Sequence, residues 1–382
     1  MKKLGLLLVT AVVAAPFVSC DDNDSTKVTT EETLSGFYTI NGGNKSGKIH
    51  ASMTAFDFAT GSSTDPMQCA FQNANGIALG DGAQQALIYG SKMYIAMYSS
   101  NLIWVVELNT LKIIGSITPE GDAKSPRYLV AKNGKVYCSM YTGYVSEIDT
   151  TALAITRNVK VGPNPDQMAL RNNDIVVACS DGQNSKGNAT GGVKYGNCCI
   201  SIVNLESFTE SRIQNLDKVL NPTDAASNGK DCFVVCKGDY YDATKPNTVV
   251  KVVGNDVQKV CLGTNIAVEG DNLYVIYAQN GDDGTHYTYK VYDTTTLKEK
   301  GTIADQTSTA DAKIDAPNGV FVDPVSGDIV MLSYTLDAAG KAQYREPSYA
   351  NVYDKAGNFK KRVNCGVGAR GVTFVHKTIS SK

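Results

Sequence analysis

The stretch that decides the fold is Ser125–Gly162, SPRYLVAKNGKVYCSMYTGYVSEIDTTALAITRNVKVG. It contains four short runs rich in β-branched and aromatic residues, separated by Asn-Gly and Asp-Thr turns, a pattern typical of strands joined by hairpins. The predicted strands are Tyr128–Ala131, Lys135–Met140, Tyr144–Asp149 and Ile155–Val161. The stretch therefore predicts one antiparallel unit of four strands.

Related units recur along the chain with a period of roughly 40–55 residues, each opening with a Pro or small residue ahead of an apolar strand. Besides the copy at Ser125, the units open with Ala83–Tyr98, Asn164–Cys179, Asn221–Cys236, Gly263–Tyr277 and Ala316–Leu332. Four strands at this period predict an all-β fold, a seven-bladed β-propeller with six complete copies as blades. An irregular β-sandwich is the alternative, but sandwiches do not repeat in this way.

The seventh unit is split between the two ends of the chain. Gly368–Val375 resembles an innermost strand with nothing after it, whereas Gly36–Asn41, Ala51–Phe58 and Met67–Phe71 resemble three strands that lack an innermost one. We therefore expect the first blade to be closed by N- and C-terminal strands, which removes free sheet edges.

The N-terminus predicts export and anchoring. Lys2 and Lys3 precede a short apolar run that ends at Ser19-Cys20, and this run is too short to span a bilayer. The segment resembles a bacterial lipoprotein signal, which implies cleavage before Cys20 and lipidation of that cysteine; an ordinary secretory signal is the alternative. The expected divisions are a signal peptide over 1–19, a flexible acidic tether over 20–33 and the propeller over 34–377.

Composition and motifs point away from several classes of function. A net charge of −2, without a basic run, argues against nucleic-acid binding. The three histidines lie far apart in sequence, no metal motif occurs, and no cofactor or catalytic residue is predicted. Gly42-x4-Gly47-Lys48 resembles a phosphate-binding loop, but Ile49 replaces the required Ser or Thr, so a plain hairpin loop is expected.

Nine cysteines remain after Cys20, and most are expected to be small buried hydrophobic residues. An exported protein can form disulfides, although an odd number leaves at least one thiol free. Cys179 with Cys198 or Cys199 is the best candidate pair, because adjacent strands of one blade would contain them.

Polar residues recur where the innermost strands begin, which in a propeller is one mouth of the central channel. The aligned positions are Gln85, Arg127, Asp166, Thr223, Thr264, Asn318 and Arg370. A polar ring at a concave mouth is a natural ligand platform, and simple solvation or ordered water in the channel is the alternative.

Tyrosines cluster in the segments after the second strand of each blade, which should share the face of the polar ring. The predicted ligand-binding tyrosines are Tyr98, Tyr141, Tyr240, Tyr241 and Tyr277. Three of these connections are long, namely Asp181–Asn197, Lys237–Asn247 and Leu336–Ser348, and long loops often have a function. The alternative is that exposed Tyr side chains merely cover sheet edges.

The run GYVSEIDTTALAITRNVKVGPNPDQMAL, together with FYTINGG and SPRYLV, resembles YncE-like seven-bladed propellers, in particular surface lipoproteins of Bacteroidetes of the cobalamin-capturing BtuG type. The resemblance spans about Leu34–His376. It implies a surface-exposed lipoprotein of the outer membrane, attached to the membrane by its lipid anchor only.

The expected function is non-enzymatic capture of a large small-molecule ligand, with a corrinoid as the first candidate, and delivery to a TonB-dependent transporter. Fold alone does not specify the ligand. A scaffold that binds a protein partner is the second possibility. A propeller lyase or lactonase is the third, and it is disfavoured because no His or carboxylate cluster is evident in the sequence.

Overall fold

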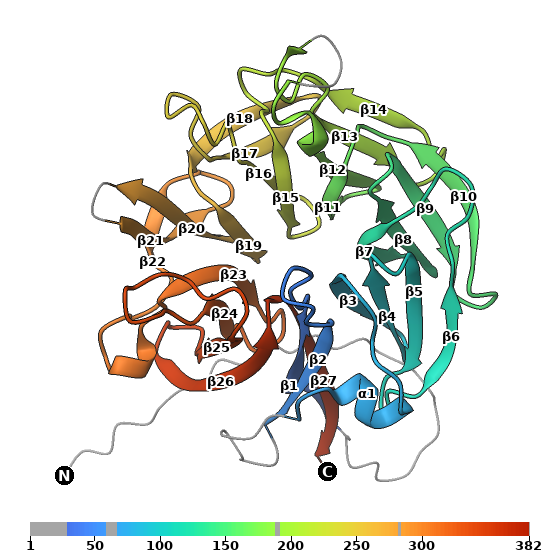
Figure 1. The fold of residues 1–382 in the computed structure, drawn as a ribbon, viewed down its shortest axis with the longest axis vertical. Coiled ribbons are helices and arrows are strands. Elements are labelled where there is room, and N and C mark those ends of the chain that lie inside the picture. Colours follow the sequence, from blue (N-terminus) through green and yellow to red (C-terminus); the bar gives the residue numbers. More distant parts are fainter. Residues whose placement is uncertain (1–28, 59–66, 188–191, 282–283, 382) are drawn as a thin grey trace, which may run out of the picture.

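The computed structural model describes residues 29–58, 67–187, 192–281 and 284–381. Its sheets are arranged as seven antiparallel blades in a ring, which confirms the predicted seven-bladed propeller (Figure 1). Six blades have four strands each, ordered outward from the centre as β3–β6, β7–β10, β11–β14, β15–β18, β19–β22 and β23–β26.

The strands are short and rich in β-branched residues. The first three of these blades contain β3 Ala83–Tyr89, β4 Lys92–Met97, β5 Leu102–Glu107, β6 Ile113–Ile117, β7 Pro126–Lys132, β8 Lys135–Met140, β9 Tyr144–Asp149, β10 Ala154–Lys160, β11 Pro165–Arg171, β12 Asp174–Cys179, β13 Cys199–Asn204 and β14 Glu210–Ile213. The other three contain β15 Pro222–Ser227, β16 Cys232–Cys236, β17 Thr248–Val253, β18 Asp256–Leu262, β19 Asn265–Glu269, β20 Asn272–Gly281, β21 Gly284–Asp293, β22 Glu299–Thr302, β23 Ala316–Val322, β24 Ile329–Tyr334, β25 Pro347–Tyr353 and β26 Phe359–Val367.

The seventh blade joins the two ends of the chain, as the sequence predicts. Its order is β2-β1-β27, with β27 (Ala369–Ser381) innermost, β1 (Thr29–Asn41) next and β2 (Ser52–Asp57) outside it. The register of β1 and β27 runs from Asn41 opposite Ala369 to Thr29 opposite Ser381. The chain therefore enters the propeller beside the C-terminal end of β27, at the face opposite the start of that strand.

Two sequence predictions about this blade are wrong. Met67–Phe71 is not a strand, because only Met67 forms a bridge, to Ala55, and helix α1 (Ala70–Asn75) follows. Tertiary contacts override the strand-like pattern: Phe71 is fully buried against Trp104, and the Asn75 amide donates to the Leu111 carbonyl. The predicted tether over 20–33 is also too long, because its last five residues belong to β1.

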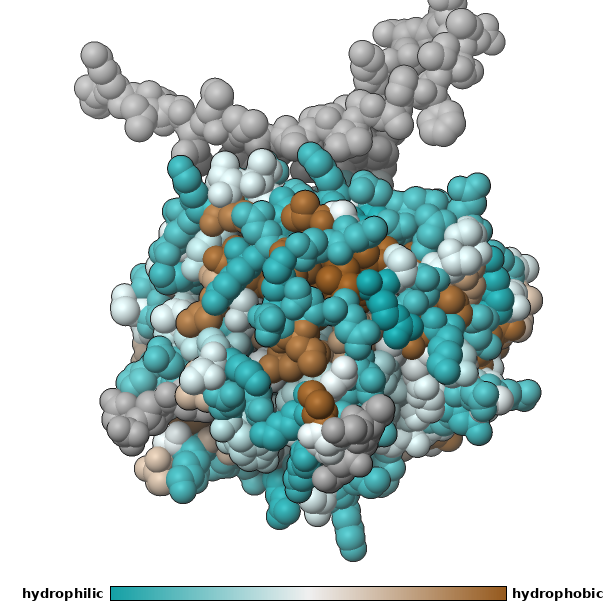
Figure 2. Space-filling view, turned by 90° about the horizontal axis from the view of Figure 1, so that it is seen from above, coloured by the Kyte–Doolittle hydropathy of each residue, from teal (hydrophilic) through white to brown (hydrophobic). Residues whose placement is uncertain are grey.

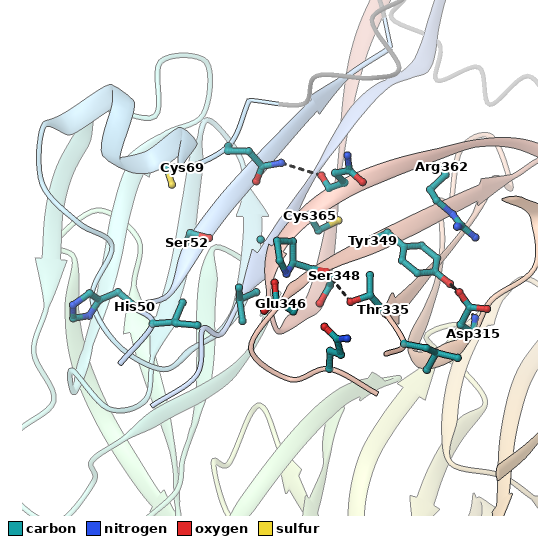
Figure 3. A pocket seen from close by; sticks show the side chains of 18 residues that line it. His50, Ser52, Cys69, Asp315, Thr335, Glu346, Ser348, Tyr349, Arg362 and Cys365 are labelled. Carbon is teal, nitrogen blue, oxygen red and sulfur yellow. Dashed lines mark hydrogen bonds between the residues drawn. The ribbon is translucent and has the colours of Figure 1, made fainter. Parts of the chain in front are cut away.

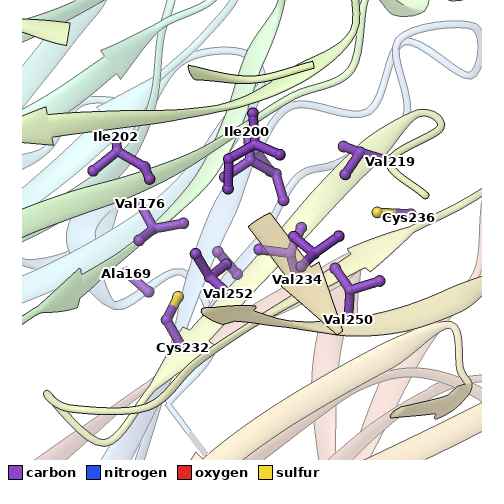
Figure 4. Close-up of a cluster of buried hydrophobic side chains, with 14 residues drawn as sticks. Ala169, Val176, Ile200, Ile202, Val219, Cys232, Val234, Cys236, Val250 and Val252 are labelled. Atoms are coloured by element: carbon purple, nitrogen blue, oxygen red, sulfur yellow. The ribbon is translucent and has the colours of Figure 1, made fainter. Parts of the chain in front are cut away.

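Hydrophobic layers between neighbouring blades hold the ring together. Figure 4 shows one such layer, in which Val176 and Ile200 of one blade lie against Val234 and Val250 of the next. All four side chains are buried, and branched side chains pack well on a pleated surface. Each blade thus buries its faces on its neighbours.

The inner strands determine the geometry of the central channel. They contact one another in a closed circle, β3-β7-β11-β15-β19-β23-β27 and back to β3. Within a blade, the end of the second strand lies opposite the start of the first, as Met140 lies opposite Pro126. The connections after the second strands therefore share one face with the starts of the inner strands.

Candidate functional site at the channel mouth

Six of the seven blades have a β-bulge or register shift where the inner strand begins. The shifts lie between Ala83 and Gln85, Pro126 and Leu129, Pro165 and Met168, Pro222 and Asp224, Pro317 and Gly319, and opposite Ile40 and Asn41 on β27. The first polar residue within each shift is, in turn, Gln84, Arg127, Asp166, Thr223, Asn318 and Arg370, and we call these six residues the mouth ring. Bulges re-aim side chains and are over-represented beside functional sites.

Gln84 links the two arginines of the mouth ring. Its Oε1 accepts hydrogen bonds from Arg127 Nη2 at 3.3 Å and from Arg370 Nη1 at 3.2 Å. Arg127 also forms an ion pair with Asp166, with 3.2 Å between Nη1 and Oδ2. The Nε atoms of both arginines are buried and have no partner among the described residues. The two cations are therefore held side by side, and each has an Nε–H group that is free to donate a hydrogen bond.

Two of the predicted tyrosines border this group. The Arg127 guanidinium lies 5.6 Å from the ring centroid of Tyr98 and 5.1 Å from that of Tyr141. The two rings pack edge to face, with 5.3 Å between their centroids. The cation–π contacts and the ion pair fix the orientation of Arg127. The polar ring and these tyrosines thus share one face, as the sequence predicts.

Asp224 and Lys237 add charge to the channel below the ring. Both line a cavity of about 780 Å³ to which all seven inner strands contribute, and Gln85, Asn318 and Arg370 line it as well. Burial raises the pKa of Asp224 to about 6, and neighbouring Asp166 adds to this rise while Lys237 and Arg127 oppose it. No hydrogen bond to the Asp224 carboxylate is found among the described residues, and the residue lines the cavity.

The other predicted residues form no hydrogen bond with Gln84, Arg127 or Arg370 among the described residues. Gln85 accepts from the Leu129 backbone, and Asn318 donates to the Ala369 carbonyl. Thr264 is used within its own blade, because its hydroxyl donates to Ile276 and accepts from Ala278. The Thr223 hydroxyl is buried and has no partner among the described residues.

The remaining predicted tyrosines occupy two separate places. Tyr240 and Tyr241, on the loop between β16 and β17, are 80% and 68% exposed and pack edge to face. Lys194 Nζ lies 5.2 Å from the Tyr241 ring centroid and forms an ion pair with Asp239. Tyr277 lies on β20 opposite Thr288, and no contact among the described residues joins it to Arg127.

Sequence reasoning missed Gln84, Asp224 and Lys237. A signal for Gln84 exists, because it directly follows the small residue Ala83, as Arg127 follows Pro126 and Arg370 follows Ala369. In that copy the bulge moves the equivalent position by one residue, from Gln85 to Gln84. Asp224 and Lys237 have no such signal, since their proximity results from the closure of the ring.

A second cavity, of about 1040 Å³, lies between the blade of β23–β26 and the closing blade. Figure 3 shows Asp315 and Tyr349 directed toward each other across part of its wall, with 2.8 Å between Tyr349 Oη and the carboxylate. Arg362 lies over the Tyr349 ring and donates to backbone carbonyls. These three side chains already contact one another or the backbone, so they are not available to a ligand. The smaller channel cavity is therefore the better candidate site.

The predicted lipidation residue Cys20 lies outside the described residues, as does the apolar run before it. Among the described residues, no helix is long and apolar enough to cross a bilayer.

Comparison with known proteins supports the fold only. No protein-family model matches the chain, and no curated protein matches it. The solved structure of Kuenenia stuttgartiensis hydrazine synthase is similar, with a TM-score of 0.57 at 13% identity over 78% of this chain and 95% of that chain. The computationally designed Ika8 protein gives a TM-score of 0.54 at 10% identity, over 90% and 92% of the two chains. At such identities the likeness is one of propeller architecture.

Proposed function

We propose that the protein is a non-enzymatic, lipid-anchored surface protein that captures a large small-molecule ligand and passes it to a TonB-dependent outer-membrane transporter. The observation that supports the proposal most is the arrangement of Arg127, Arg370, Tyr98 and Tyr141 at one mouth of the channel. Guanidinium groups offer several rigid donors, and Tyr offers large contact area with few rotamers. A corrinoid is the first ligand to test, on the family resemblance.

The entry point of the chain agrees with this role. The channel mouth lies at the start of β27, whereas Thr29 pairs with Ser381 at its other end. An anchor attached before Thr29 would join the propeller at the face opposite the mouth, which leaves the mouth free to face away from the membrane. A ligand arriving from outside the cell would then meet the mouth first.

A protein-binding scaffold is the competing function. Stable protein interfaces usually need a wide apolar patch. Figure 2 shows one side of the ring, where apolar side chains occur in separate groups among hydrophilic ones. On this side, therefore, the apolar groups are too scattered to form a broad docking patch.

The first experiment is a thermal-shift screen of the unlipidated chain with cyanocobalamin, haem, siderophores and glycans. A ligand at about 100 times its Kd adds about 2.7 kcal/mol to the free energy of unfolding. The second is calorimetric titration of the Arg127→Ala/Arg370→Ala variant. We expect affinity to fall by about 10- to 100-fold, mainly through faster dissociation, because buried arginine contacts are typical hot spots.

Arg157→Ala is the matched control. Arg157 also pairs with a carboxylate, Glu147, and lies over an aromatic ring, Phe208, but it belongs to the outer strand β10. Its loss should leave ligand affinity unchanged. Equal affinities of the wild type and the double variant, with folding intact, would move the site elsewhere and favour a scaffold.

A further inference from the structure

The channel below the mouth ring changes from polar to apolar along its axis. All inner strands begin at the same mouth, so residues later in each strand lie deeper, by about 7 Å for every two residues. Six of these deeper residues line the cavity and are apolar: Leu87, Val130, Leu170, Val268, Phe321 and Val372. They come from six different inner strands, so the apolar wall surrounds the channel.

These six side chains are only half-buried, whereas apolar residues of the second strands, such as Met93, Val136 and Ile175, are fully buried. An apolar wall left open to water carries an unfavourable free energy that an apolar occupant removes. A volume of about 780 Å³ is within the range of ligand cavities. The channel is therefore suited to a slender apolar group.

The charges at the polar end favour an anion. Arg127 and Asp166 neutralise each other as an ion pair. Arg370 has only the neutral Gln84 as a side-chain hydrogen-bond partner among the described residues, and Lys237 has none. Asp224 is the opposing carboxylate, and even in its ionised form it offsets only one of these two positive charges. The unpaired charge at this end is positive.

We propose that the channel binds a linear aliphatic carboxylate, with its head group at Arg370 and Lys237 and its chain along the apolar wall. The proposal shares Arg370 with large-ligand capture at the mouth, but its chain portion is separate, because the apolar wall lies deeper than the tyrosines. The lipidated form is unsuitable for a test, since its own acyl groups would compete, so the full chain with Cys20→Ser is used.

The test is calorimetric titration with sodium decanoate, and with butyrate, decan-1-ol and decyltrimethylammonium as comparison probes. We expect one decanoate per protein, bound at least tenfold more tightly than butyrate or the cation. Arg370→Gln should weaken decanoate binding about tenfold and leave decan-1-ol binding unchanged, because only the carboxylate needs the guanidinium. This variant lies at the wet mouth and tests the head group without altering the apolar wall.

Val372→Glu tests the chain portion by placing a charge in the apolar wall, and it should abolish decanoate binding. Ile114→Glu, at a 47% exposed position on the outer strand β6, is the matched control. No saturable decanoate binding, equal or tighter binding of the cation, or unchanged affinity in a folded Val372→Glu protein would overturn the proposal. A failure of this kind leaves the corrinoid titrations unaffected, so the two proposals fail separately.

Discussion

At the scale of single residues, Asp224 makes the stability of the protein depend on pH. In the unfolded chain its carboxyl group titrates near the usual value of about 3.9. In the folded protein, burial raises its pKa to about 6. The folded state thus binds the Asp224 proton more tightly than the unfolded state does. The resulting contribution to the free energy of unfolding is fully present below about pH 4 and is lost as the pH rises through 6.

Asp224→Asn should therefore stabilise the protein at pH 8, by about 1–2 kcal/mol once water in the channel is allowed for, and have little effect at pH 4. Urea unfolding at both pH values measures this difference. Asp217→Asn, which removes an exposed carboxylate, is the control. Equal effects of the Asp224 substitution at the two pH values would contradict the assignment.

Of the cysteine pairs that the sequence leaves open, the structure brings Cys179 and Cys199 together, both as free thiols. They lie directly opposite each other on β12 and β13, where Cα separations of about 4.5–5.5 Å suit a disulfide. Both sulfurs lie beside the same glycine, Gly162. Cys198 instead donates to the Val219 carbonyl, in the next interblade layer.

Refolding with oxidised glutathione should join Cys179 to Cys199, with release of two reduced glutathione molecules for each disulfide formed. The crosslink should add about 3 kcal/mol to the free energy of unfolding. Peptide mapping of the non-reduced protein identifies the bond. Cys198→Ser should leave it intact and Cys199→Ser should remove it; the reverse result would show that the register is wrong.

Single residues also show where the sequence stops being informative. Arg127, Asp166, Asn318 and Arg370 were predictable because each follows closely on the Pro or small residue that opens an inner strand. The bulges were not predictable, since a bulge is defined by the partner strand. For this reason the sequence pattern predicts Gln85 in place of Gln84. The position of Lys237 beside Asp224 depends on the tertiary structure alone.

At the scale of secondary-structure elements, turn signals decided how well strands could be predicted. β8 and β9 have the predicted bounds, because Asn-Gly, Thr-Gly and Asp-Thr turns lie at their ends. The segment from Met67 to Phe71 lacks such a pair of signals. Its conversion to a bridge and a helix depends on packing against Trp104, which is distant in sequence.

Strand β27 should be essential for folding. Truncation after Gly368 removes the innermost strand of the closing blade, including buried Ala369 and the side chains of Val372 and Phe374 that pack on the neighbouring core. Each lost core side chain lowers the free energy of unfolding by about 2–5 kcal/mol. The sum over several of them exceeds the total free energy of unfolding of most domains. We expect aggregation and loss of cooperative thermal unfolding.

Deletion of residues 379–382 is the control for this truncation. It removes only the end of β27 that pairs with residues 29–31. The shorter deletion should unfold cooperatively, with a small decrease in Tm. If the protein truncated after Gly368 melts like the wild type, then β27 does not close the ring in solution.

At the scale of the whole molecule, the proposed anchoring rests on one residue outside the described part of the chain, Cys20. Cys20→Ser should abolish lipidation and release the protein from the membrane, because the lipoprotein signal in the sequence provides this cysteine alone as acyl acceptor. Metabolic labelling with a fatty acid, followed by membrane fractionation, measures both effects. Cys69→Ser is the control, and labelling that survives Cys20→Ser would refute the lipoprotein prediction.

The pairing of β1 with β27 also determines when the protein can fold. Six blades form from contacts between strands that are close in sequence, but the closing blade joins Thr29 to Ser381. Bringing such distant segments together is slow, because the loss of chain entropy precedes the gain in contacts. The ring therefore remains open until the last strand has been synthesised, and the six locally formed blades stay an open array until β27 pairs with β1.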